Sequence, residues 1–164
     1  MKALLIIALI STTAFAGIIE YGPQVGYWAP TGDVGDAYNG NIYIGGQVLV
    51  HLPLMAVEGS VGYVALNDNQ DLPGFSGHMI PVTAGIRSYM GPLYAAGGIE
   101  LDMSSVEFEI ITGPSEESDS QLGGYIGAGV VPMIPFMADI DASVRLHFID
   151  FSDMWVGVTV GLNF

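Results

Sequence analysis

The 164-residue chain contains no cysteine and only three lysine and arginine residues. The absence of cysteine excludes a disulfide framework and an N-terminal lipid anchor on cysteine. The shortage of cations excludes nucleic-acid binding, because no basic patch is available to neutralise phosphates. Lys2 lies at the start of the chain, so Arg87 and Arg145 are the only later cations against 17 acidic residues. No nucleic-acid partner is expected, and no motif points to a cofactor.

Long apolar runs are also missing, apart from one at the N-terminus. There Lys2 precedes an apolar stretch from Ala3 to Ile10, and Ala14-Phe15-Ala16 has the pattern of a signal-peptidase site. The apolar stretch is too short to span a bilayer as a helix. We therefore predict a signal peptide at 1–16 and a single exported domain at 17–164. A buried core helix is the alternative for the first residues.

Apolar residues are nevertheless abundant, and they are spaced two apart. They make up 51% of the chain, which also holds 23 glycines. From Met154 to Phe164 every even position is apolar. Strict alternation over this length is typical of a tilted strand that crosses a bilayer with one face toward lipid.

Seven further segments alternate in the same way, and none has the period of a helix. The expected strands are Ile19–Ala29, Ile42–His51, Ala56–Leu66, Met79–Tyr89, Leu93–Asp102, Leu122–Val131, Phe136–His147 and Met154–Phe164.

The connections between these strands alternate between long and short. Outer-membrane barrels have tight periplasmic turns and longer external loops. We therefore predict an all-β fold, an eight-stranded antiparallel transmembrane up-and-down barrel with both termini periplasmic. The long connections are Pro30–Asn41, Asn67–His78 and Met103–Gln121, Ile149–Asp153 is intermediate, and Leu52–Met55, Met90–Pro92 and Pro132–Pro135 are short.

The third long connection contains alternation of its own. Val106, Phe108 and Ile110 are apolar on the parity opposite to Leu93–Leu101. We interpret the change as a β-bulge near residues 104–105, after which a hairpin projects beyond the membrane. An irregular loop is the alternative.

No charged residue falls on the apolar row of any expected strand. An arginine or lysine facing lipid near the midplane would cost about 2–4 kcal/mol, which explains this distribution. An eight-stranded barrel is just wide enough for side chains to fill it, so we expect a lumen filled by a polar network. Its members on the inward row are Glu20, Glu58, Arg87, Glu100, Asp102, Asp139, Asp141, Arg145 and His147.

A buried guanidinium needs carboxylate partners. Glu58 and Arg87 both lie near the turn end of neighbouring strands, so we expect them to pair. Surplus carboxylates must be protonated, hydrated near a mouth, or compensated by a cation or by His147. The carboxylates expected to reach Arg145 are Glu100, Asp102 and Asp141.

Two features near the outer rim could carry chemistry. His147 could form a dyad with Asp150 or Asp153, although no nucleophile motif such as G-x-S-x-G occurs. The acidic stretches Asp68–Asp71 and Glu116–Asp119 could bind divalent cations weakly, although neither has EF-hand spacing. A hydrogen-bonded lumen histidine and solvated loop charges are the simpler interpretations.

The signal sequence, strand number, loop alternation, charged lumen and terminal Phe164 together resemble the OmpA/OmpX-like family of eight-stranded outer-membrane barrels. The resemblance implies outer-membrane localisation, contact with lipid, and an assembly signal at Phe164 that the barrel-assembly machinery reads. We expect a monomer with a structural or surface-interaction role through acidic external loops, and no catalysis.

Three alternatives remain open at this point. The first is a narrow conduit for small or hydrophobic molecules, as in OmpW-type barrels. The second is a lipid-modifying barrel enzyme that uses His147. The third is a soluble lipocalin-like barrel with the apolar rows turned inward. Its outer surface would then be rich in glycine and almost without cations, whereas soluble surfaces normally mix Lys with Glu.

Overall fold

The computed structural model describes residues 19–32, 38–68, 76–110, 113–132, 138–150 and 153–164. The predicted signal peptide lies outside these residues. Within them, no helix is long and apolar enough to cross a membrane. The described strands are β1 (Ile19–Thr31), β2 (Tyr38–Asn39), β3 (Asn41–Leu52), β4 (Met55–Asp68), β5 (Ser76–Met90), β6 (Leu93–Ile110), β7 (Gly113–Val130), β8 (Asp139–Asp150) and β9 (Asp153–Asn163).

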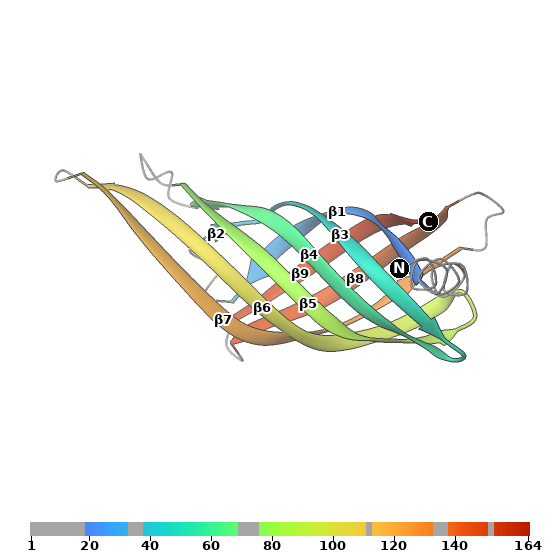
Figure 1. Cartoon of the computed structure of the whole chain (residues 1–164). Coiled ribbons are helices and arrows are strands. Elements are labelled where there is room, and N and C mark those ends of the chain that lie inside the picture. Colours follow the sequence, from blue (N-terminus) through green and yellow to red (C-terminus); the bar gives the residue numbers. More distant parts are fainter. Residues whose placement is uncertain (1–18, 33–37, 69–75, 111–112, 133–137, 151–152) are drawn as a thin grey trace, which may run out of the picture.

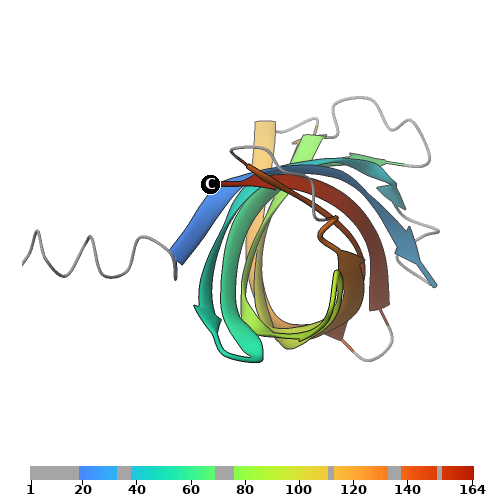
Figure 2. The ribbon, with the colours of Figure 1, turned by 90° about the vertical axis from the view of Figure 1, so that its right-hand side faces the viewer.

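Eight of these strands close into one antiparallel barrel, which confirms the predicted all-β, eight-stranded antiparallel architecture (Figures 1 and 2). The sheet order is β2-β4-β3-β1-β9-β8-β7-β6-β5, and a further pairing of β4 with β5 completes the ring. The short β2 pairs only with the end of β4. The first and last strands are joined by β1–β9 pairing, and Phe164 and Tyr21 exchange backbone hydrogen bonds of 3.0 and 3.3 Å.

The two ends of the barrel differ in their connections. At the turn end, Leu52 pairs with Met55 and Met90 with Leu93, so two residues connect each pair of strands. Gly91 has a φ of 67°, which two-residue hairpin turns require and which glycine adopts without strain. The C-terminus also lies at this end (Figure 1). We call the opposite end, where β6 meets β7, the loop end.

The structure corrects the prediction of a long loop over Met103–Gln121. Strands β6 and β7 pair without a register shift from Leu93–Val130 to Ile110–Gly113, so residues 103–110 and 113–121 are strand and no bulge occurs near Ser104. Inward and outward positions alternate along β6 without interruption. What changes is the chemical character of the inward side chains. Val106 faces inward and packs on buried apolar side chains, because the inward row becomes apolar toward the loop end.

Polarity in this barrel is the reverse of that in a soluble one. Large apolar side chains point outward from the described strands, among them Val25, Ile44 and Ile99, which are 53%, 62% and 62% exposed. Charged and amide side chains in the middle of the strands, such as Gln47, Glu58 and Arg87, point inward and are buried. This arrangement argues against the lipocalin-like alternative, because soluble monomers rarely expose an apolar surface of this extent.

Inward glycines make room for large rings in the lumen. A Cβ atom on Gly62 would overlap the ring of Tyr43, and one on Gly129 would overlap the ring of Tyr94. Trp28, Tyr43, Tyr94 and Trp155 are each only 2% exposed, as their inward parity predicts. Small residues on one strand therefore allow aromatic residues on a neighbouring strand to lie across the lumen.

Candidate functional site: the lumen and the loop end

Arg87, on β5, is the centre of the buried polar side chains. Its Nε donates to Glu58 Oε2, its Nη1 to Asp141 Oδ2 at 2.5 Å, and its Nη2 to Gln47 Oε1 at 2.6 Å. The guanidinium carbon also lies 4.4 Å from the centroid of the Tyr94 ring, within the range of a cation–π contact. Arg87 is fully buried, and the expected pair with Glu58 forms.

Glu58 connects Arg87 to a second guanidinium. Its Oε2 accepts from Arg145 Nη2 at 3.0 Å, and its Oε1 accepts the hydroxyl of Tyr125. Arg145 also lies over the ring of Tyr125, 5.0 Å from the centroid. The prediction that Arg145 would pair with Glu100, Asp102 or Asp141 is wrong. Strand tilt carries Arg145 toward Glu58 on β4, across the lumen, and leaves Asp141 to Arg87.

Sequence reasoning missed the amide and phenol members of this network. Gln47 Nε2 donates to Asn163 Oδ1 at 2.7 Å and to Asp141 Oδ2 at 3.1 Å. Gln24 Nε2 donates to Gln47 Oε1 at 2.6 Å, and the Tyr94 hydroxyl donates to Asp141 Oδ1 at 2.6 Å. Inward parity on a strand was the available signal for all of them.

These residues form what we call the Arg87 network. Every strand of the barrel contributes at least one side chain to it, so the network ties the whole circumference together across the lumen. Its members are Gln24, Gln47, Glu58, Arg87, Tyr94, Tyr125, Asp141, Arg145 and Asn163.

His147 belongs to a neighbouring group nearer the loop end. Its Nδ1 lies 2.5 Å from Glu100 Oε2, and its ring lies 3.9 Å from that of Trp28. Asp102 is buried, and neither of its carboxylate oxygens has a hydrogen-bond partner among the described residues. Glu100 and His147 are therefore brought together, whereas Asp102 is not bonded to any cation.

The remaining predicted members lie at the turn end. Glu20 Oε1 is 3.1 Å from His51 Nε2, and both side chains are 29% exposed. The ring of His51 stacks on Tyr89 at 5.7 Å. Asp139 is half-buried at the start of β8 and forms no ion pair with the part of the chain that the structure describes.

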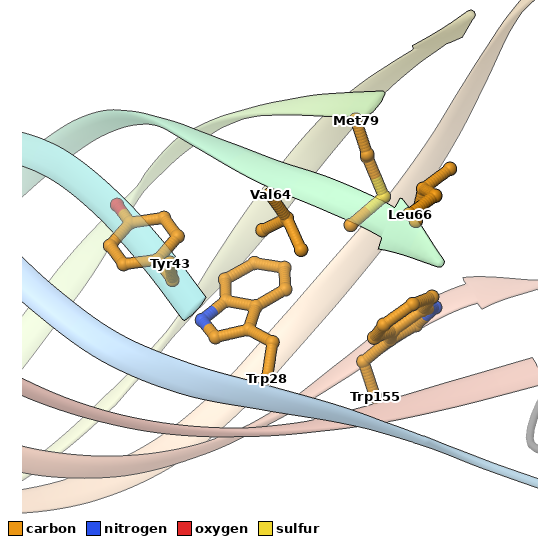
Figure 3. Close-up of a cluster of buried hydrophobic side chains, with 6 residues drawn as sticks. All are labelled: Trp28, Tyr43, Val64, Leu66, Met79 and Trp155. Carbon is orange, nitrogen blue, oxygen red and sulfur yellow. The ribbon is translucent and has the colours of Figure 1, made fainter. Parts of the chain in front are cut away.

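A cluster of buried apolar side chains lies toward the loop end of the lumen (Figure 3). The rings of Trp28 and Tyr43 are stacked, with centroids 5.1 Å apart and planes within 4°. Val106 packs against the same group. We call it the loop-end cluster, and its buried members are Trp28, Tyr43, Val64, Leu66, Met79 and Trp155.

Between the network and the cluster lies a cavity of about 10 Å³, lined in part by Arg145, His147 and Thr83. This space is about that of one water-sized probe. Among the described residues, no group of three or more His, Asp or Glu is placed to hold a metal ion. The stretch Glu116–Asp119 is part of β7, and residues 69–71 of the other acidic stretch lie outside the description.

The β6–β7 hairpin extends farther than the neighbouring strands at the loop end (Figure 1). Both strands run over 18 residues, whereas β8 has 12 and β9 has 11. On its other side, β7 pairs with β8 only from Gly124 to Val130. Among the described strands, residues 113–123 of β7 are therefore paired on one side alone.

No protein-family model matches the chain, and no curated protein matches it by sequence. Solved structures match it in fold. Neisserial surface protein A (NspA) gives a TM-score of 0.57 at 13% identity and covers 88% of this chain and 95% of its own. Ail, the attachment invasion locus protein of Yersinia pestis, in complex with the heparin analogue sucrose octasulfate, gives 0.60 at 17% identity and covers 89% of this chain and 97% of its own. The chain shares its fold with these eight-stranded outer-membrane barrels of the OmpA/OmpX type.

Proposed function

We propose that the chain is a small integral outer-membrane barrel that acts by contact at its loop end and carries out no catalysis. The observation that carries this proposal is the reversed polarity of the barrel. Its outward row is apolar from Val25 on β1 to Val158 on β9, and both arginines lie buried inside. A closed wall with an apolar exterior satisfies every backbone group in lipid without a free edge.

The connections support an orientation with the loop end outside the cell. Tight turns of outer-membrane barrels face the periplasm, and both turns described above lie at the end that carries the C-terminus. Both termini are then periplasmic. Phe164 joins the last strand to the first through its backbone hydrogen bonds with Tyr21. Its side chain is 57% exposed on the lipid-facing side, where an assembly machinery could bind it. A monomer is consistent with a barrel whose own closure leaves no edge within the membrane.

Passage of solutes is a weaker candidate. The Arg87 network joins all eight strands across the lumen, and the loop-end cluster covers it. The cavity between them is about 10 Å³, which supports a packed interior over a conduit. Conductance across planar bilayers tests this point, and a steady open channel in the folded chain would favour the conduit.

A lipid-modifying enzyme is also less well supported. His147 is 1% exposed, with its Nδ1 at Glu100 and its ring against Trp28. An imidazole so placed cannot reach a substrate at the rim. The side chains of Asp150 and Asp153, the other members of the proposed dyad, lie outside the description. Turnover of lipid that is lost in a His147→Ala variant would support the enzyme.

The charge of the chain also limits the surface ligands that it can bind. Ail is seen with a sulfated heparin analogue, a polyanion. Here both later cations, Arg87 and Arg145, are buried in the lumen, and the formal net charge is −14. We therefore propose cationic ligands at the loop end, either positively charged partners or weakly bound divalent ions, in place of polyanions.

One experiment tests the membrane assignment directly. Residues 17–164 are folded into detergent or lipid vesicles, and boiled and unboiled samples are compared on an SDS gel. A closed membrane barrel should resist SDS and migrate differently until it is boiled. A chain that folds in plain buffer without lipid and shows no shift on the gel would contradict the proposal.

A further inference from the structure

The two hairpin turns at the turn end carry large apolar side chains. Residues 52–55 join β3 to β4 and read Leu-Pro-Leu-Met, and residues 90–93 join β5 to β6 and read Met-Gly-Pro-Leu. We call these two turns the turn-end rim. Turns that face water are normally rich in Gly, Asn, Asp and Ser. We propose that the turn-end rim is a membrane-binding surface, seated among the lipid headgroups of the periplasmic leaflet.

Side chains of the rim face away from the lumen and continue the outer wall. Leu54 is 80% exposed and Met90 is 68% exposed. On β4, Met55 follows directly on the outward row of Val57, and the two turns are neighbours because β4 pairs with β5. On β3, β4 and β6 no polar side chain separates the rim from the apolar wall, and on β5 Ser88 does. The rim therefore extends the surface for which lipid contact is proposed.

Backbone polar groups of the rim find partners within the protein. Pro53 and Pro92 have no N–H group to satisfy. The Leu54 C=O accepts the Tyr89 N–H at 3.4 Å, and the Pro92 C=O accepts the Val131 N–H at 2.8 Å. A turn in water can bond to water instead, whereas a turn in a region with little water must satisfy its backbone groups internally. The rim is therefore suited to the membrane boundary.

The height of the apolar wall places the rim at that boundary. On β6 the outward row has no polar side chain from Leu93 to Met103, and the next outward position is Ser105. Roughly ten residue steps of about 3.3 Å, tilted by about 40°, rise about 25 Å, which is the height of the apolar band in outer-membrane barrels. The band is filled only if it begins at the rim, so no polar spacer separates the lipid from the turns.

The distribution of polarity at the turn end favours lipid over a soluble partner. On the lumen side, Glu20 and His51 form their half-exposed contact. On the outer side lie the apolar side chains of Leu52 and Leu54. A soluble partner that docked on the end of the barrel would cover the polar mouth together with the rim. A lipid leaflet surrounds the barrel and contacts its outer side alone, which matches this division.

The inference rests on the proposed membrane assignment, so the test measures both. Because the chain has no cysteine, a single introduced cysteine is a unique site for a nitroxide spin label. The label is placed at Leu54→Cys in the full mature chain, in lipid vesicles, after the gel shift has confirmed folding. Ile99→Cys, on the exposed outer wall, is the lipid reference, and Ser118→Cys, exposed beyond the apolar band at the loop end, is the water reference.

Collisions of each label with oxygen, which concentrates in lipid, are compared with collisions with a water-soluble nickel complex. The Leu54 label should collide with nickel at least about threefold less often than the Ser118 label, because apolar side chains at the interface lie below the water. Equal nickel collision at Leu54 and Ser118, with the Ile99 label still protected, would overturn the inference and leave the membrane assignment intact. This is the result expected if the rim serves a soluble partner. Nickel collision at all three labels would overturn both.

A charge in the rim provides a second arm. Met90→Asp, in the neighbouring turn, should raise nickel collision at the Leu54 label about twofold or more, because a buried carboxylate is costly and draws the turns toward water. Ser118→Asp is the matched control, since it adds the same charge at the other end of the barrel and should leave the Leu54 label unchanged. An equal rise in the control, or no rise with Met90→Asp, would contradict the proposal.

Discussion

The middle of the lumen and its loop end are held together by different forces. Around Arg87 the contacts are hydrogen bonds and ion pairs, and each depends on a specific donor and acceptor. Around Trp28 the contacts are between rings and aliphatic side chains, which tolerate small shifts. The same inward row thus changes from charged to apolar along one barrel.

The difference indicates what each region contributes. A buried ion pair gains little over apolar packing of the same volume, but breaking it leaves an uncompensated charge. The hydrogen bonds of the Arg87 network need specific donors and acceptors in place, which makes the network suited to fixing the relative positions of the strands. The loop-end cluster excludes water in proportion to its buried apolar area. Four variants can break or sharpen this comparison.

The largest effect is expected from Glu58→Leu, in the Arg87 network. It keeps a similar volume but leaves Arg87 without its Nε partner and removes the ion pair that Arg145 forms with Glu58. We expect a loss of about 3–5 kcal/mol in the free energy of unfolding, as for other broken buried pairs. Urea unfolding in lipid vesicles measures it, followed by tryptophan fluorescence. A loss below about 1 kcal/mol would contradict the role given to the network.

Met79→Ala tests the loop-end cluster in the same assay. Met79 is 3% exposed and packs with Leu66 and Trp155. Removal of a buried methionine side chain should cost about 2–5 kcal/mol. Met103→Ala is the matched control, because Met103 points outward from β6 and is 39% exposed. Equal losses in the two variants would show that the cluster is no better packed than the outer face.

Tyr94→Phe removes a single hydrogen bond from the polar region. The Tyr94 hydroxyl donates to Asp141 at 2.6 Å, and its ring makes a cation–π contact with the Arg87 guanidinium. Phenylalanine keeps the ring, so we expect a loss of about 1.5–3 kcal/mol, typical of a hydrogen bond to a charged group. Tyr21→Phe, on the outer face, should change the unfolding free energy much less. A Tyr94 variant as stable as the parent would show that Asp141 does not depend on this donor.

The smallest effect is expected from Glu20→Gln at the turn end. Its contact with His51 is 3.1 Å long, but both side chains are 29% exposed. Exposed pairs contribute about 0–1 kcal/mol, because solvent screens them. The variant therefore serves as the reference for Glu58→Leu, because it also removes a carboxylate but from a more solvent-exposed site. A loss comparable to that of Glu58→Leu would remove the distinction between buried and exposed pairs.

Much of the fold follows from alternation alone. The parity of each segment places Glu58, Arg87 and Asp141 on the inward row, and strand neighbours follow from short turns such as that at Gly91. The pair of Glu58 and Arg87 is predictable because the two residues lie on adjacent strands. Alternation also places the large apolar side chains on the outside, where lipid contact is proposed.

The errors have a common physical cause. The sequence predicts that Arg145 pairs with nearby carboxylates, but it pairs with Glu58 on the opposite wall of the barrel. Similarly, the apolar parity of Val106 suggested a bulge, whereas the residue packs inward on the loop-end cluster. Glu58 lies on a strand that is not adjacent to β8, and the cluster that Val106 joins draws side chains from five strands, so spacing along the chain gives little information about either contact.

The sequence by itself determined which residues face inward, how many strands form and which strands are neighbours, because side-chain alternation and short connections are local properties. Only the tertiary structure decided which inward side chains meet. In a narrow barrel of tilted strands, the stagger brings rows from opposite walls to the same depth, as Arg87 on β5 and Asp141 on β8 show. The tertiary structure likewise decided that β8 pairs with β7 only from Gly124 to Val130, since this depends on where the two strands lie beside each other.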